Sequence, residues 1–392
     1  MDPPFIIYKT MSFLNRKHIS LAVFTGLMGI AWACGSSDSG SDPVADPLDR
    51  KPMLEHWADN IIIPSYNNFE VKLDAMTTAA DAFRTNPTTT TLSGFRAAWL
   101  NAYTEWQKVE MFEVGPGDKY TIRNFFNIYP ADEAGIAEYM ANPSANMAVP
   151  AAYPRQGFPA LDYLINGLAE TDEDILEYYT TDANAAQRLA YIKRITDRMN
   201  DLLASVLGEW KGAYRETFVS KTGLDISSST GLMVNTFVLY YERFIRSGKF
   251  GIPSGALTSS GGTKHPEKVE AYYKRDLSRT LAETAHQAAI NFFNGVNVLN
   301  AQEGPSFKSY LDALDAKDGA TGTALSAIIN AQFSVADAKI NTLSDNFYEQ
   351  VQTNNQAMLD AYAEMQKAVR MLKVDMTSAM SVTITYTDND GD

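Results

Sequence analysis

The side chains that build most catalytic and metal centres are scarce in this sequence. It contains one cysteine and four histidines among 392 residues. One cysteine excludes an intramolecular disulfide, and a catalytic zinc ion needs three protein ligands, most economically histidines, with one open position. The sequence also lacks an H-E-x-x-H pair, a G-x-S-x-G elbow, a Walker loop and a dinucleotide-binding fingerprint. We therefore expect no zinc site of the histidine type and none of these common enzyme sites.

Positive charge is scarce as well. The chain has 33 lysines and arginines against 47 aspartates and glutamates, a net charge of −14, and no dense basic stripe offsets this locally. An acidic protein repels phosphate backbones, so we expect no nucleic-acid partner. Hydrophobic residues at 45% and charged residues at 20% are typical of a soluble globular protein. The length predicts two domains.

The first 33 residues have the pattern of a secretory signal. Arg16-Lys17-His18 precedes an apolar run from Ile19 to Trp32, which is too short to span a bilayer comfortably and ends among small residues. Met11 is the more natural start of this segment. Ala33-Cys34 resembles a bacterial lipobox, which implies cleavage before Cys34 and diacylation of that residue. The alternative is a secreted protein that is cleaved nearby and keeps a free thiol.

A polar segment follows the cysteine. Residues 35–42 are rich in Gly, Ser and Asp, so we expect residues 34–48 to be a flexible tether. An acidic, Ser-rich stretch in this place also resembles the surface-export signal of Bacteroidetes lipoproteins. No later apolar run is long enough to span a bilayer. The prediction is a protein of the cell envelope, anchored by lipid to the outer membrane on its periplasmic or surface face.

Helical periodicity dominates from Arg50 onward, and it predicts an all-α fold of two helical-bundle domains. The predicted helices are Phe95–Glu113, Asp182–Thr217 with Asp182 as N-cap, Gly231–Ser247, Pro266–Gly295, Ser306–Asp315, and 335–375 with a break at Thr353–Asn355. Only Ser381–Tyr386 has the alternation of a strand.

One segment stands out as an internal boundary. Gly248–His265 is rich in Gly, Ser and Pro and separates two blocks of helices, and Thr222–Thr230 is a second break. We predict an N-terminal bundle over residues 49–228, a C-terminal bundle over 229–378 and a tail over 379–392. An internal duplication of a four-helix-bundle-like unit is a further hypothesis.

The three histidines after the signal segment do not fall on apolar helix faces. His56 projects away from its apolar neighbours, His286 projects with Arg275 and Arg279, and His265 lies in a flexible loop. We expect all three to be solvated and none to be a metal ligand.

Two acids belong to an aromatic helix face. Glu110 and Glu113 continue the face of Trp99 and Trp106, and burying a carboxylate without a partner costs several kcal/mol. In one interpretation Gly115-Pro116-Gly117 ends the helix near Phe112 and leaves both acids in solvent. In the other, the acids share a cavity with Asp132 or Asp162, and such a pocket suits a hard cation, a cationic ligand or a buried Arg.

A second acid lies in the segment QGFPALDYLI. Pro159 has no N–H to donate and fits the first turn of a helix, so it predicts a helix start. Asp162 follows three residues later in an otherwise apolar segment, where an acidic first turn is favourable.

Several motifs, in order, resemble the imelysin family, also called imelysin-like or M75 peptidases. The motifs are F-R-A-A-W at 95–99, Trp106, E-x-F at 110–112, N-I-Y-P-A-D at 127–132, G-F-P-A-L-D-Y-L at 157–164, K-F-G-I-P at 249–253 and V-E at 269–270. Together they span most of residues 50–375.

The resemblance implies two all-α domains with a site where they meet, a cell-envelope location and a link to iron uptake. The family hallmark is G-x-H-x-x-E, proposed as a metal or active-site motif. In this chain Gly157 is kept, Pro159 stands at the histidine position and Asp162 at the glutamate position. Because Pro159 has no side-chain ligand, a metal site that needs imidazole there cannot form in the family's manner.

These observations favour a non-catalytic, lipid-anchored binding protein with a pocket between its domains, linked to uptake of iron or another metal. Its ligand would be a metal cation, for which Glu110, Asp132 and Asp162 are the candidates, or a small molecule. The alternatives are a divergent peptidase that activates water with carboxylates alone and a surface scaffold that binds a protein partner. The predicted pocket residues are Trp99, Trp106, Glu110, Tyr129, Asp132, Gly157, Pro159 and Asp162.

Overall fold

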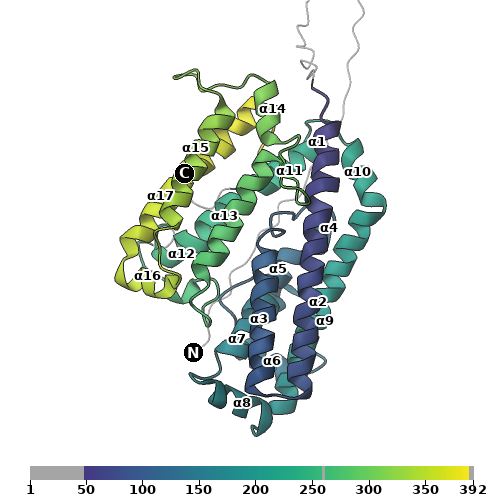
Figure 1. Ribbon diagram of the computed structural model, residues 1–392, viewed down its shortest axis with the longest axis vertical. Helices are drawn as coiled ribbons and strands as arrows, with labels where there is room; N and C mark the ends of the chain where they lie inside the picture. Colours follow the sequence, from purple (N-terminus) through teal and green to yellow (C-terminus); the bar gives the residue numbers. More distant parts are fainter. Residues whose placement is uncertain (1–47, 258–260, 388–392) are drawn as a thin grey trace, which may run out of the picture. The chain divides into compact units, whose positions relative to one another are not determined.

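The fold is helical throughout the residues that the computed structural model describes, 48–257 and 261–387 (Figure 1). That part has no strand and only two isolated β-bridges, Val296–Glu303 and Lys317–Ala324. The predicted all-α class is confirmed. Within the same residues, no helix has both the length and the apolar composition that a membrane span requires. The predicted signal segment, Cys34 and nearly all of the predicted tether lie outside the described residues.

We call the two predicted domains the N-terminal half (49–228) and the C-terminal half (from 229). The N-terminal half contains α1 (Lys51–His56), η1 (Trp57–Ile62), α2 (Ile63–Thr85), α3 (Thr89–Trp106), α4 (Pro116–Lys119), α5 (Ile122–Phe126), α6 (Glu133–Ala141), η2 (Pro150–Arg155), α7 (Gly157–Asn166), α8 (Asp172–Thr180), α9 (Ala185–Glu209), η3 (Trp210–Tyr214) and α10 (Arg215–Ser220).

The C-terminal half contains α11 (Ser229–Leu239), η4 (Tyr240–Gly251), α12 (Ile252–Ser254), η6 (Pro266–Lys268), α13 (Ser278–Asn294), α14 (Phe307–Ala313), α15 (Leu325–Ile340), α16 (Phe347–Thr353), α17 (Asn355–Arg370), η7 (Met371–Met376) and α18 (Thr377–Ala379). Of the η segments, η2 and η6 are 3₁₀-helices and η1, η3, η4 and η7 are π-helices.

Each half is organised around long neighbouring helices. In the N-terminal half α2 packs against α3 and α9, and in the C-terminal half α17 packs against α15 and η4 while α13 packs against α15 (Figure 1). The start of α3 is encoded locally, because Thr88 forms a capping box with Thr91. These helices place their apolar faces inward, as the periodicity predicts.

The hydrophobic core is continuous between the halves. The ring of Trp57 in η1 lies 5.3 Å from Phe292 and 4.8 Å from Phe307, and Phe112 lies 5.6 Å from Phe292. The described residues from Leu48 onward belong to one compact unit. The boundary after residue 228 and the internal duplication stay predictions.

Several predicted helix boundaries are wrong. The helix predicted to reach Glu113 ends at Trp106, and the chain continues in turns to Met111. The helix predicted to begin at the Asp182 cap begins at Ala185, with Asn184 as N-cap. The Pro266–Gly295 helix is regular only over α13, because residues 269–277 form a loop in which Ala271 and Arg275 have positive φ.

Two segments differ in type from the prediction. Gly248–Ser254, predicted as part of a flexible boundary, is helical. Ser381–Tyr386, predicted as a strand, forms none: Thr385 N donates to Asn235 Oδ1, and Asn235 Nδ2 donates to Thr383 O. The break predicted at Thr353–Asn355 is confirmed at Asn354, between α16 and α17.

Candidate functional site

Five buried polar side chains meet where the two halves touch. We call them the junction cluster: Gln107, Glu110 and Asn127 from the N-terminal half, and Lys249 and Glu270 from the C-terminal half. None is more than 4% exposed. Gln107 and Glu110 face this cluster because α3 ends at Trp106 and the following turns redirect the chain.

Hydrogen bonds fix the orientation of the two amides. Asn127 Nδ2 donates to Glu110 Oε1 at 3.1 Å and to Glu270 Oε1 at 2.8 Å. Its Oδ1 accepts from the Tyr103 hydroxyl at 2.6 Å. Gln107 Nε2 donates to Glu270 Oε1 at 3.0 Å, and its Oε1 accepts from Lys249 Nζ at 2.7 Å. Because a buried ion pair is stable only when its remaining lone pairs and protons are satisfied, these amides complete the Lys249–Glu270 pair.

Lys249 reaches the cluster because η4 is a π-helix. Tyr240 and Lys249 are nine residues apart, about two and a half turns of an α-helix, which would place them on opposite sides. With the wider π turn, nine residues make about two turns. The Tyr240 hydroxyl donates to the Gln107 backbone oxygen at 3.3 Å while Lys249 binds the side chain of the same residue. π-Helical segments often occur at functional sites.

Glu110 is the one incompletely bonded member. Its Oε1 accepts from Asn127, but its Oε2 is buried and has no partner among the described residues. Burial raises the pKa of Glu110, the nearby Lys249 lowers it, and the charge of Glu270 raises it further. The Tyr129 hydroxyl is close enough for the charges of Glu270 and Glu110 to raise its pKa beyond the effect of burial. A Cβ added at Gly248 would lie 3.2 Å from that hydroxyl.

Arg123 and Glu113 lie beside the cluster. Arg123 donates through Nε and Nη2 to the backbone oxygen of Glu110 at 3.1 and 2.8 Å, and its guanidinium lies 4.1 Å from the ring centre of Phe244. Glu113 accepts from the backbone N–H of Arg123 at 3.1 Å, and burial raises its pKa to about 7. Neither interpretation of the two acids is therefore complete: Glu110 is buried, whereas Glu113 is partly buried and bonded elsewhere.

Asp162, at the glutamate position of the family hallmark, has both oxygens occupied. Its Oδ2 accepts from the backbone N–H of Tyr273 at 3.0 Å, and its Oδ1 accepts from that of Lys274 at 3.1 Å and from Asn166 Nδ2 at 2.9 Å. Burial raises the pKa of Asp162, these hydrogen bonds lower it, and because burial is the larger effect the pKa is about 7. Asp162 therefore connects α7 to the loop before α13.

Gly157 and Pro159 position α7. Gly157 has φ +75°, and a Cβ there would lie 2.3 Å from the backbone oxygen of Phe126, so only glycine fits. The helix begins at Gly157, and Pro159 is buried in its first turn, close to the predicted helix start. The residues present do not fit a metal ion in the manner of the hallmark motif, since Pro159 offers no ligand and both oxygens of Asp162 already accept hydrogen bonds from the protein.

Asp132 lies apart from both of these sites. It caps α6 by accepting from Gly135 N at 2.9 Å and pairs with Arg155 Nε at 2.9 Å, and its side chain is 35% exposed. Glu110, Asp132 and Asp162 thus have separate partners. Within residues 48–257 and 261–387, no group of three or more His, Cys, Asp or Glu side chains could hold a metal ion.

The two predicted tryptophans belong to the core. Trp99 Nε1 donates to the backbone oxygen of Phe158 at 3.2 Å, and the ring of Trp106 stacks on Phe126 at 4.8 Å. Both are fully buried. They support the turn that carries Glu110 as part of the core.

Two of the histidines expected in solvent are buried. His286 is fully enclosed, within 3.3 Å of the Tyr241 hydroxyl and 3.1 Å of the Phe333 backbone oxygen, and burial lowers its pKa. His56 bonds the Gly295 backbone oxygen at 2.8 Å. Only His265 is at the surface, 3.0 Å from Glu267. The helix projection failed for His286 because η4 and α15 pack onto α13.

The sequence motifs contain Asn127, Lys249 and Glu270, but none of the three was predicted as a site residue, and Gln107 was missed. The available signal was the placement of polar residues beside aromatic ones, as in Trp106-Gln107 and Phe126-Asn127. That signal is weak, because many such residues face solvent.

Comparison with known proteins identifies the family. The family model described as Imelysin (peptidase M75) matches residues 62–374. The chain belongs to the imelysin family. Among solved structures, an imelysin-like protein from Psychrobacter arcticum 273-4 has a TM-score of 0.66 at 15% identity, covering 86% of this chain and 97% of that one. A "putative iron-regulated protein A precursor" from Parabacteroides distasonis ATCC 8503 has a TM-score of 0.63 at 17% identity, covering 85% and 97%. These two structures share the fold. A search of curated proteins finds no match.

Proposed function

We propose that this imelysin-family chain is a non-catalytic binding protein of the cell envelope, anchored by lipid on Cys34 and involved in uptake of iron or another metal. Its ligand site is the junction cluster between the halves. The observation that carries the proposal is the contrast between Asp162, whose two oxygens both accept hydrogen bonds, and Glu110, whose Oε2 is buried without a partner in the described chain.

The hallmark position argues against peptidase chemistry. A water-activating group needs a free oxygen or nitrogen within hydrogen-bond reach of the water. Both oxygens of Asp162 accept from the protein, and Pro159 has none to offer. The position connects two segments of the fold and does not present a reactive group.

The junction cluster favours a ligand that is cationic or donates hydrogen bonds. A buried polar atom without a partner costs roughly 1–3 kcal/mol, and more when it is charged, so a donor bound at Glu110 Oε2 gains that amount. Lys249 already pairs with Glu270, so Glu110 Oε2 is the acceptor that stays available to the ligand. Because three ligating side chains do not gather in the described residues, a metal ion bound at this cluster would keep most of its own ligands.

The link to metal uptake has weaker support, from the family and from the fold shared with a protein described as iron-regulated. The lipid anchor has support from the sequence alone: the basic segment, the apolar run and the Ala33-Cys34 pair that follows them. Labelling of the expressed protein with radioactive palmitate tests the anchor. Label should enter the wild type and be lost in Cys34→Ser, and a wild type without label contradicts the anchor.

Calorimetry tests the ligand site. Iron(II), calcium, manganese and zinc are titrated separately into the wild type, Glu110→Gln and Asp132→Asn. At least one cation should bind the wild type and Asp132→Asn, and binding should be lost in Glu110→Gln. Asp132 is the matched control because it is an acid of the same half outside the cluster. Absence of binding for all four cations, or equal binding by Glu110→Gln, contradicts a cation at this site.

A divergent peptidase is a second candidate, because a raised pKa is what a carboxyl needs to act as general acid or base near neutral pH, and burial raises that of Glu110. Hydrolysis of unfolded casein by purified wild type, with none by Glu110→Gln prepared in parallel, would establish this function and overturn the non-catalytic proposal.

A further inference from the structure

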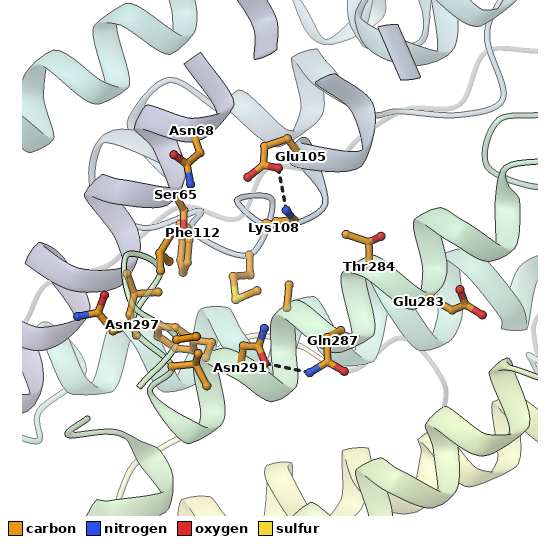
Figure 2. A pocket seen from close by; sticks show the side chains of 17 residues that line it. Ser65, Asn68, Glu105, Lys108, Phe112, Glu283, Thr284, Gln287, Asn291 and Asn297 are labelled. Carbon is orange, nitrogen blue, oxygen red and sulfur yellow. Dashed lines mark hydrogen bonds and ion pairs between the residues drawn. The ribbon is translucent and has the colours of Figure 1, made fainter. Parts of the chain in front are cut away.

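A groove lies on the other side of the turns that carry Glu110. Its volume is about 540 Å³, and both halves line it: α2 and the turns after α3 on one side, α13 and the loop after it on the other (Figure 2). Lys108 and Met111 face this groove, whereas Gln107 and Glu110 from the same turns belong to the junction cluster. The groove is therefore a separate place from the proposed site, and its size is within the range of small-molecule pockets.

The wall of the groove offers hydrogen bonds that the protein does not use. Ser65 is only 5% exposed, and its hydroxyl has no partner in the part of the chain that the structure describes. Gln287 donates to Asn291 Oδ1 at 2.9 Å, which leaves Gln287 Oε1 and Asn291 Nδ2 for a ligand. Figure 2 shows Asn291 and Gln287 on one wall and Ser65 and Asn68 on the other. Amides and hydroxyls both donate and accept, which suits a ligand with several hydroxyl groups.

The charges of the groove are already paired. Glu105 pairs with Lys108 at 2.8 Å and Glu283 with Arg279 at 2.9 Å. The groove therefore presents no excess charge that would favour a charged ligand. The apolar part of its lining, such as Ile61 and Val298, can contact the apolar face of an uncharged ligand.

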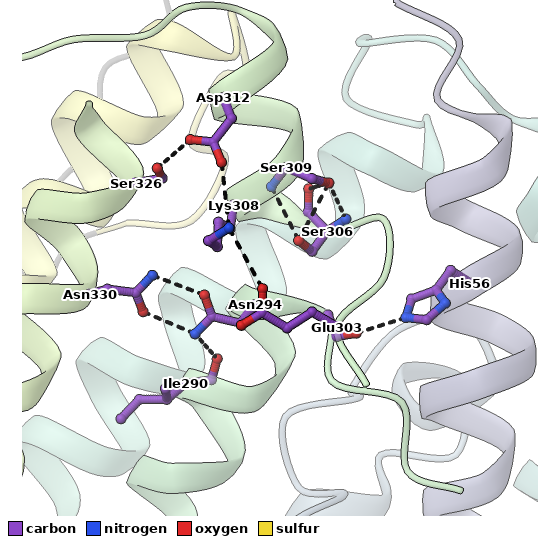
Figure 3. A network of polar contacts seen from close by, with 11 residues as sticks. His56, Ile290, Asn294, Glu303, Ser306, Lys308, Ser309, Asp312, Ser326 and Asn330 are labelled. Carbon is purple, nitrogen blue, oxygen red and sulfur yellow. Dashed lines mark hydrogen bonds and ion pairs between the residues drawn. The ribbon is translucent and has the colours of Figure 1, made fainter. Parts of the chain in front are cut away.

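One wall is a strap, residues 295–304, that crosses from the C-terminal half to η1. The Gly295 backbone oxygen bonds His56 Nε2 at 2.8 Å, and Val298 N donates to Asn60 O at 3.0 Å. Gly304 N donates to Gly295 O at 2.9 Å and closes the strap. Figure 3 shows His56 beside the strap. A Cβ at Gly304 would lie 2.2 Å from the His56 ring, so glycine is required for this contact.

We propose that this groove, with the strap as one wall, is a second binding site that takes an uncharged polyhydroxyl ligand of the saccharide type. The unused hydroxyl and amide groups bind its hydroxyls, the apolar lining contacts the face of its ring, and the paired charges leave no excess charge to attract an anion or a cation. This site is independent of the junction cluster.

Saturation-transfer NMR on the full chain tests the proposal, with three sugars that differ in charge: N-acetylglucosamine, glucosamine and glucuronate. Signal transfer should be strong for neutral N-acetylglucosamine and weak or absent for the other two. Absence of transfer to N-acetylglucosamine, or stronger transfer to a charged sugar, overturns the proposal.

Two matched variants locate the binding. Ala288→Trp on α13 fills the groove and should abolish the transfer, whereas Thr280→Trp, an exposed position on the same helix outside the groove, should leave it unchanged. Gly304→Ala should weaken it by displacing the strap from His56. Thermal melting of each variant shows whether it is folded. Equal transfer in folded Ala288→Trp and wild type overturns the location.

Discussion

Asp162 and Glu110 are both buried carboxylates that face the opposite half of the chain, yet their surroundings differ. Asp162 accepts three hydrogen bonds, two of them from backbone N–H groups of the loop before α13. Glu110 accepts one on its side chain and has a buried oxygen without a partner among the described residues. A carboxylate whose two oxygens both accept hydrogen bonds from the protein connects segments of the fold. A carboxylate with an oxygen that lacks a partner, beside a hydrogen-bonded ion pair, is available to a ligand.

Asp162, the acid at the hallmark position, has a structural role because it holds the loop before α13. Ala271 and Arg275 have φ of 55° and 61°, a conformation that costs non-glycine residues free energy. Asp162 accepts from two residues between them, Tyr273 and Lys274. Its two backbone bonds stabilise a loop that also presents Glu270 to the junction cluster.

The largest effect should come from breaking the ion pair of the junction cluster. Lys249→Met leaves the Glu270 carboxylate buried without its counter-charge, and such losses cost about 3–5 kcal/mol. Urea unfolding followed by circular dichroism measures this. The double variant Lys249→Met/Glu270→Gln should recover part of the loss, because no charge then stays unpaired. A change below about 1 kcal/mol in Lys249→Met would show that the pair is not buried as described.

Asp162→Ala should be next in size. It leaves the N–H groups of Tyr273 and Lys274 without an acceptor; both residues are only partly buried, so each should lose no more than the lower end of the about 1–3 kcal/mol for a buried group. The same unfolding experiment should show a smaller loss for Asp162→Asn, which keeps one acceptor oxygen. If the alanine and asparagine variants are equally stable, the backbone contacts do not connect the two segments.

The pH dependence of stability separates the effect of the Asp162 proton from the effect of its hydrogen bonds and packing. Its pKa is raised from 3.8 to about 7 in the folded state, so between these values the native protein holds a proton that the unfolded chain has released. The free energy of unfolding therefore falls as pH rises through this window. Asp162→Asn cannot titrate, so its stability should fall less between pH 4 and 7.

Melting temperatures of the two proteins across that range check this expectation. Glu113, whose pKa is also about 7, titrates in both and cancels in the difference. Parallel curves for wild type and Asp162→Asn would contradict the raised pKa of Asp162.

Glu110→Gln should have a small effect on stability although it removes a buried acid. The amide keeps an oxygen for Asn127, and exchange of a buried carboxyl of raised pKa for a neutral isostere should change the free energy of unfolding by no more than about 1 kcal/mol. If Glu110 serves binding, ligand affinity should be lost at unchanged stability. A loss of stability as large as that of Asp162→Ala would show that Glu110, like Asp162, has a structural role.

Asp132→Asn should have the smallest effect. Its ion pair with Arg155 is partly exposed, such pairs contribute about 0–1 kcal/mol, and asparagine is as good an N-cap as aspartate. Unfolding in urea should show a difference within that range. A larger loss would place Asp132 among the structurally essential acids.

The fold class was accessible from the sequence because helix periodicity is a local property. The apolar positions of α3, α9 and α17 recur at helical spacing whatever they pack against. Helix ends were less accessible: α3 was predicted to reach Glu113 because Glu110 continues its face in projection, although the chain leaves the helix after Trp106. The predicted exposure of His56 and His286 was wrong for a related reason, since a projection of one helix does not show which of its faces a neighbouring segment covers.

The candidate site could be predicted only in part from the sequence. The resemblance to the imelysin family directed attention to Glu110, Tyr129 and Asp162, but not to which of them meet. Tyr129 and Glu110 lie at the junction cluster, Asp162 is bonded elsewhere and Asp132 caps a helix. The partners Lys249 and Glu270 are more than 100 residues from Glu110 in the chain, and no local pattern relates residues at such a separation.

The sequence by itself determined the helical class, the family and the absence of an imidazole at the hallmark position, because these depend on residue identity and on spacing within a few turns. Only the tertiary structure decided which carboxylate has hydrogen-bond partners on both oxygens and which has an oxygen without a partner. Hydrogen-bond satisfaction depends on the groups that other segments bring within about 3 Å. For Asp162 those groups are two N–H groups of a distant loop, and for Glu110 Oε2 the described chain supplies none.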